Sequence, residues 1–235
     1  MAASLISNAL QVTTDSVLSF PDEGMVAMFK DLESTGLRGF LEFPSVLYEQ
    51  DLESFFSYAT VHGDSVISCV QSKYVGFFEE LFAGTFGLPT EGLASMYEVP
   101  RELVYDVRSL FSVSGKPVKT SFKKKELKIE FCMMNDILAK SVTVTAGSFD
   151  AVAHERFLLM TAIHFGLKIN WSKILFDILK EMVTKSSKKA KGFVAQICVL
   201  LKGAPDLTLG EVKTFPPLKI LIVKNKNITA EEETD

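Results

Sequence analysis

The chain is 235 residues long and 47% hydrophobic, with a mean hydropathy of +0.21. This is ample apolar surface for a packed core, so disorder is excluded for most of the length. The formal net charge is only −4, but residues 1–115 hold 5 Lys and Arg against 16 Asp and Glu, whereas residues 116–228 hold 20 against 9. An acidic half followed by a basic half indicates two surfaces that attract each other, within one molecule or between molecules.

Helical periodicity dominates the acidic half. We expect a helix that Asp22 caps and Gly36 ends, and a second helix that opens at Pro44 and carries Leu52, Phe55 and Phe56 on its buried face. The β-branched segment 60–70 is different, because Gly63-Asp64 separates two short extended runs. This pattern predicts a small β-hairpin.

Two more helices are expected before the charge changes sign. Ser72 is placed to cap a helix with Tyr74, Phe77, Phe78, Leu81 and Phe82 in register, which ends near residues 84–87. Pro100 stands at the first turn of the next helix, where apolar residues recur at spacings of three and four.

The basic half continues in the same style. Ser121 is expected to cap a long helix, residues 141–145 to be extended, and Asp150 to start a helix through Phe165. Asn170 can cap another helix, and a last helix runs through Leu201 and is closed by Gly203. Between these two lies a lysine-rich loop, and residues 224–235 are expected to fray.

These elements predict a mainly α-helical globular protein with one small β-hairpin, folded as one unit or as two packed subdomains. The expected divisions are an N-terminal segment 1–20, an acidic helical subdomain 21–111 with the hairpin near 60–70, a linker 112–120, a basic helical subdomain 121–211, and an irregular tail 212–235.

The sequence shows no targeting or membrane signal. Its start has no basic region before an apolar run, and no stretch approaches the roughly 18 apolar residues of a membrane-spanning helix. Cys69, Cys132 and Cys198 are too scattered for a disulfide framework and are expected as reduced residues in apolar surroundings. We therefore expect an intracellular protein, cytoplasmic or nuclear, that is not secreted and contacts no membrane.

No catalytic or metal-binding constellation stands out. The three histidines are His62, His154 and His164, and the last two lie on one predicted helix but point about 80° apart. The sequence has no zinc-ligand spacing, nucleophile motif or phosphate-binding glycine loop. We expect no enzyme activity, no catalytic residue, no metal, no cofactor and no small-molecule ligand.

Two lysine clusters are the candidate contact residues. They comprise Lys123, Lys124, Lys125 and Lys128 in one cluster and Lys185, Lys188, Lys189 and Lys191 in the other. Three interpretations stay open: a solvated surface, contact with phosphates of a nucleic acid, and docking on the acidic half. Lysine alone suits backbone phosphates better than base edges.

Three segments carry a family resemblance. They are Phe43-Pro-Ser-Val-Leu-Tyr-Glu with Phe55-Phe56, the stretch from Val61-His-Gly-Asp to Phe86-Gly-Leu-Pro89, and Phe157 to Asn170 running on to Leu201. Together with Gly147–Val152 and Leu179–Thr184, they resemble the plant transposon protein domain family, which occurs in retrotransposon-derived plant proteins often labelled dystroglycan-like. The resemblance implies a transposon origin and brings no catalytic residues.

The resulting hypothesis is a non-catalytic interaction or assembly module of plant transposon origin. Its partner would be a second copy, joined head to tail by charge, or another protein. The alternative is a nucleic-acid-binding protein that uses its lysine clusters, and an enzyme of unrecognised type is the third hypothesis.

Overall fold

The computed structural model describes residues 22–42, 46–119, 122–144, 151–184 and 192–214, and the backbone of 221–224 and 227–230. Its helices are α3 Glu23–Ser34, α4 Arg38–Leu41, α5 Glu49–Tyr58, α6 Glu79–Phe86, α7 Arg101–Leu110, α8 Ile129–Ile137, α9 His154–His164, α10 Trp171–Val183 and α11 Val194–Lys202. Short 3-10 turns occur at η1 Met96–Glu98 and η2 Lys124–Glu126, and a π-helical turn, η3 Leu138–Val142, extends α8. The mainly helical class is confirmed.

The strands of the described residues form three small antiparallel sheets. The largest has the order β2 Thr60–His62, β3 Ser65–Val70 and β4 Lys73–Phe78. The other two pair β1 Val46–Leu47 with β5 Lys213–Thr214, and β6 Leu221–Lys224 with β7 Asn227–Ala230. The prediction of a single hairpin is therefore wrong, because β4 extends it to a three-stranded sheet and further strands occur. Residues 212–235, expected as an irregular tail, include β5, β6 and β7.

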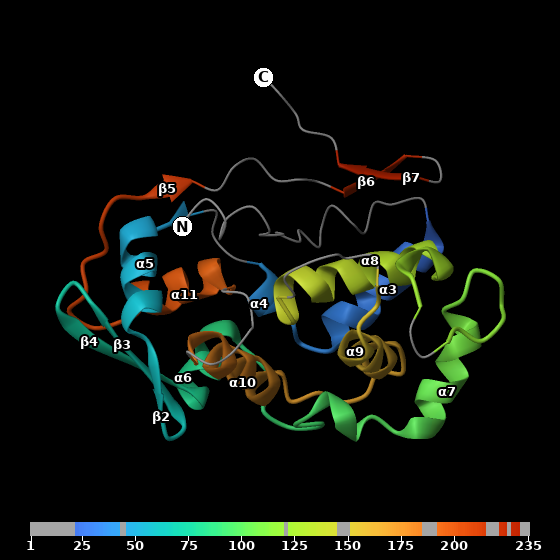
Figure 1. Ribbon diagram of the computed structural model, residues 1–235, viewed down its shortest axis with the longest axis horizontal. Coiled ribbons are helices and arrows are strands. Elements are labelled where there is room, and N and C mark those ends of the chain that lie inside the picture. The colour runs from blue at the N-terminus through green and yellow to red at the C-terminus, as the bar shows by residue number, and fades with distance from the viewer. Residues whose placement is uncertain are drawn as a thin grey trace.

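The elements gather into two ends of an elongated molecule (Figure 1). One end holds the three-stranded sheet, α5, α6, α10 and α11, and the other holds α3, α7, α8 and α9. Helix α3 packs on α8 and α9, and α6 packs on α10, so segments from before and after residues 112–120 meet at both ends. One buried hydrophobic cluster includes residues from Met25 to Leu201. The division into two subdomains along the sequence stays a prediction.

Local capping signals identify several helices correctly. Asp22 precedes α3 and accepts a hydrogen bond from the backbone N–H of Met25 at 3.0 Å, and Asn170 precedes α10 and accepts one from Lys173 at 2.9 Å. Gly203 follows α11, as expected. These short polar side chains satisfy N–H groups that the first helical turn leaves free.

The predicted hairpin is confirmed, but the segment after it is not the start of a helix. β2 and β3 pair around Gly63, whose φ of 58° suits the first central position of a two-residue turn. Residues 73–78 form the third strand, and α6 begins only at Glu79. Gln71 and Ser72 both adopt positive φ angles, of 50° and 62°, which fold β4 back onto β3.

Three other helix starts and one extended segment differ from the prediction. α5 begins at Glu49, because Val46 and Leu47 pair with β5 instead. α8 begins at Ile129, because Lys123 and Leu127 are extended and form bridges to Ala151 and Ser112. α9 begins at His154. Ser121 and Asp150, which were expected to start α8 and α9, lie outside the described residues. Residues 141–142 belong to the π-helical turn, where the backbone N–H of Thr143 donates to the carbonyl of Leu138 at 2.8 Å.

No helix in the described part of the chain combines the length and the apolar character that crossing a membrane requires.

Candidate functional site

The structure places one of the two predicted lysine clusters. Lys123, Lys125 and Lys128 are exposed around the η2 turn, whereas Lys124 is half-buried. The second cluster, comprising Lys185, Lys188, Lys189 and Lys191, lies outside the described residues. The structure therefore tests neither the contact between the clusters nor their shared use by a partner.

Lys124 belongs to a polar network rather than to a free basic surface. Its ammonium group forms an ion pair with Asp136, whose other oxygen accepts from Asn135 at 3.3 Å. Arg156, only 2% exposed, donates from Nε to Asn135 Oδ1 at 2.9 Å and from Nη2 to the carbonyl of Ala151 at 2.9 Å. Burial lowers the pKa of Arg156, which the nearby Asp136 carboxylate opposes. This network joins η2, α8 and α9 and gives Lys124 a structural role.

The histidines and cysteines do not form a reactive centre in the described residues. His164 packs edge-to-face on Phe111 and Phe131, with Nδ1 3.7 Å from Asp31 Oδ2. Burial raises the pKa of the Cys132 thiol to about 11, and that of the Cys198 thiol likewise to about 11, so both stay protonated near neutral pH. In the part of the chain that the structure describes, no three His, Cys, Asp or Glu side chains are grouped to hold a metal.

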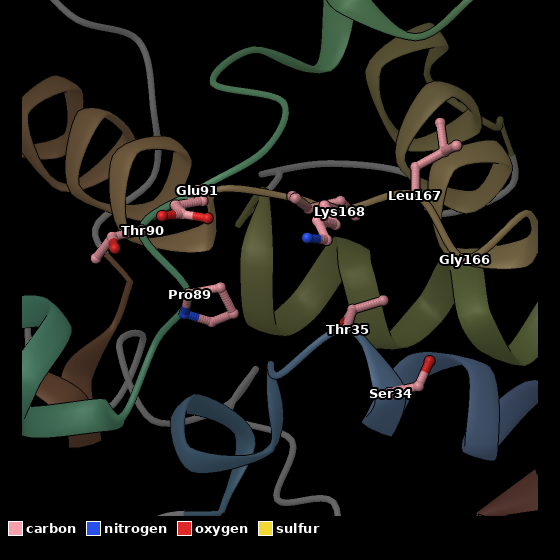
Figure 2. Close-up of a pocket in the computed structure, with 9 residues that line it drawn as sticks. Ser34, Thr35, Pro89, Thr90, Glu91, Gly166, Leu167 and Lys168 are labelled. Carbon is pink, nitrogen blue, oxygen red and sulfur yellow. The ribbon is translucent and has the colours of Figure 1, made fainter.

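A pocket of about 420 Å³ with a mixed polar and apolar lining lies where three segments meet. Figure 2 shows its lining, which comes from the end of α3, residues 89–91 and residues 166–169. Glycines allow the close approach: a Cβ on Gly36 would lie 2.6 Å from Pro89 Cγ, and one on Gly92 would overlap the carbonyl of Lys168. Backbone hydrogen bonds between Leu93 and the 168–170 segment, of 2.9 and 3.0 Å, hold the walls together.

The chemistry of this pocket does not form a catalytic set. Its two hydroxyl groups at the end of α3 are used to close that helix, because Ser34 donates to the carbonyl of Asp31 and Thr35 to that of Leu32, both at 2.7 Å. The remaining polar side chains are Thr90, Glu91 and Lys168, which lie at the surface. No base is bonded to either hydroxyl of α3, so the lining offers no activated nucleophile.

The outer face of the three-stranded sheet exposes large aromatic side chains. The pairing places Tyr74 opposite Cys69, Gly76 opposite Ile67, and Phe78 opposite Ser65, so these side chains share one face. Tyr74 is 85% exposed and Phe78 is 47% exposed, whereas the other face is buried and carries Val66, Val70, Val75 and Phe77. We define the open sheet face as residues Ile67, Cys69, Tyr74, Gly76 and Phe78. The sequence pattern did not indicate this face, because residues 73–78, which form β4, were predicted to belong to a helix that Ser72 caps.

Searches against family models, curated proteins and solved structures returned no match to this chain. The resemblance to the plant transposon protein domain family therefore stays a prediction.

Proposed function

We propose that this chain is a non-catalytic interaction module that assembles with a second copy of itself. The supporting observation is the open sheet face, where Tyr74 and Phe78 expose large aromatic side chains beside a packed interior. Aromatic residues that are exposed together are typical of protein interfaces, because they bury much area with little loss of side-chain freedom. A plant transposon origin is part of this proposal and rests on the sequence resemblance alone.

The described polar groups support a binding role over a catalytic one. The hydroxyls of Ser34 and Thr35 close a helix, the thiols of Cys132 and Cys198 are protonated, and the Arg156 network is enclosed between helices. Each of these groups serves the fold, so none is poised to transfer a proton or attack a substrate.

Charge contributes to folding as well as to association. The ion pair between Lys213 and Glu49 joins the basic half to the acidic half within one molecule, and His164 Nδ1 lies 3.7 Å from Asp31 Oδ2. Part of the attraction expected from the sequence is therefore satisfied internally. We propose that association depends mainly on apolar surface and only secondarily on charge.

Sedimentation velocity over a wide range of protein concentrations, in low and high salt, tests self-assembly. We expect the mass to rise from monomer to dimer with concentration and the effect to persist in high salt, because apolar contacts are not screened. A monomer under every condition would overturn the proposed function.

Nucleic-acid binding is the second candidate, and the exposed side chains of Lys123, Lys125 and Lys128 support it. Fluorescence anisotropy with a labelled RNA tests it, and the affinity should fall steeply as salt rises. Changing these three lysines to alanine should weaken binding, whereas changing the isolated Lys30 on α3 should not. Equal affinity in the triple variant and the wild type would count against this function.

A further inference from the structure

The outer strand of the sheet presents unpaired backbone groups. Gln71 and Ser72 form a two-residue turn, so Val70 and Lys73 are the hydrogen-bonded pair that closes it. Hydrogen-bonded and non-bonded pairs alternate along an antiparallel ladder, so Val75 and Phe77 also bond to β3. The backbone groups of residues 74 and 76, and the N–H of residue 78, therefore point away from the sheet.

In the described residues no strand pairs with this edge, although the ammonium group of Lys73 at its start donates to the carbonyl of Asp206. β4 pairs only with β3, and Tyr74, Gly76 and Phe78 are all exposed. A Cβ added to Gly76 would meet no atom within 4 Å. By contrast, the opposite edge strand, β2, has only three residues and packs against α10. A six-residue apolar edge is rare in a lone protein, because such edges pair with other strands.

We infer that β4 pairs with β4 of a second copy, antiparallel about a two-fold axis at Gly76. This inference rests on the proposed self-assembly and specifies where it occurs. The two-fold axis stands perpendicular to the sheet. Residues that lie opposite each other across the pair point to the same face of the sheet only if the axis passes at one residue, which then lies opposite its own copy. With Gly76 on the axis, Tyr74 of each copy faces Phe78 of the other, on the open sheet face. The two three-stranded sheets then become one six-stranded sheet.

The charged residues near this edge also favour a second copy of the chain as the partner. In the same register Lys73 of one copy, whose ammonium group also donates to the carbonyl of Asp206 in its own chain, lies beside the first turn of α6 in the other, where Glu79 and Glu80 are acidic. An axis at Val75 would instead place Tyr74 opposite Gly76 and Lys73 opposite Phe77, which loses both the aromatic pair and the charge pair. A glycine on the axis also leaves room for the two aromatic pairs that flank it.

Disulfide trapping tests the register directly. Hydrogen-bonded antiparallel partners have Cα atoms about 5.5 Å apart, within the range of a disulfide. We expect Gly76→Cys, in a background with Cys69→Ser, to form a covalent dimer under mild oxidation. The matched control is His62→Cys, which is exposed on the other edge of the sheet and should stay monomeric in the same assay.

A second pair of variants keeps the test independent of cross-linking. Tyr74→Lys should raise the dimer dissociation constant about tenfold or more, because it brings a charge to the paired edge. Tyr105→Lys, on α7 and 72% exposed, should leave association unchanged. Dimers that form while Gly76→Cys fails to cross-link them, or that tolerate Tyr74→Lys, would overturn this interface while leaving self-assembly intact. A wild-type chain that never dimerises would overturn both.

Discussion

Arg156 offers the sharpest test of the packing between α8 and α9. Arg156→Met keeps most of the buried aliphatic volume but removes the donors to Asn135 Oδ1 and to the carbonyl of Ala151. A buried acceptor that loses its donor costs about 1–3 kcal/mol. Asn135 is fully buried, whereas Ala151 is exposed and its carbonyl can accept from water, so only one such loss counts in full. This loss, offset in part because the charge of Arg156 no longer has to be desolvated, predicts a decrease in unfolding free energy of about 1–3 kcal/mol.

Urea unfolding of the full chain measures this change. The control is Arg38→Met, since Arg38 pairs with Glu33 and Glu42 but its side chain is 44% exposed, and we expect a much smaller effect there. Adding Asn135→Leu to Arg156→Met should recover part of the loss, because it removes one unsatisfied acceptor. If Arg156→Met unfolds like Arg38→Met, the network does not stabilise the fold as argued.

Three further predictions concern the pocket glycine, the thiols and an ionised side chain. Gly92→Ala should lower the unfolding free energy by about 2 kcal/mol or more, because φ is +108° and the new Cβ overlaps a backbone carbonyl. The control is Gly84→Ala in the exposed middle of α6, which should raise the unfolding free energy by about 0.5–1 kcal/mol. Thermal unfolding distinguishes the two variants. A thiol reagent near neutral pH should label half-buried Cys69 well before Cys132, whose pKa burial raises to about 11, and equal rates by mass spectrometry would contradict this. Burial raises the pKa of Asp177, but hydrogen bonds from Lys180 and Lys173 together outweigh burial and hold that pKa below its ordinary value. The carboxylate therefore contributes stability that is lost as pH falls through its folded pKa, and Asp177→Asn should destabilise more at about pH 7 than at about pH 2 in urea unfolding.

Local signals predict the helices best. Asp22 and Asn170 cap α3 and α10 as their positions suggest, and both caps depend only on residues within the first helical turn. The apolar face of α10 has helical spacing throughout, so its register needed no information from elsewhere.

The sheet edge was not predictable by the same reasoning. Tyr74, Phe77 and Phe78 have helical spacing as well as strand propensity, and Ser72 is a good helix cap. The structure favours the strand because Gln71 and Ser72 adopt the left-handed conformation, although neither is a residue that usually marks such a turn. β4 also pairs with a β3 whose inner face is buried, and this packing overrides local preference.

Non-local contacts account for the remaining differences. The lysine run was visible in the sequence, but the ion pair of Lys124 with Asp136 depends on a turn that local patterns placed inside a helix. Likewise, the contact of Arg156 with Asn135 joins two helices that are separate in the sequence. The pocket arises from glycine contacts between three distant segments, which no single segment indicates.

Hydrogen–deuterium exchange at low and high protein concentration tests the central claim most directly. Pairing of two β4 strands predicts that the amides of Tyr74 and Gly76 exchange more slowly as concentration rises, while those of Val75 and Phe77, already bonded to β3, change little. Exchange at Tyr74 and Gly76 that is independent of concentration, at concentrations where the chain is dimeric, would contradict the account.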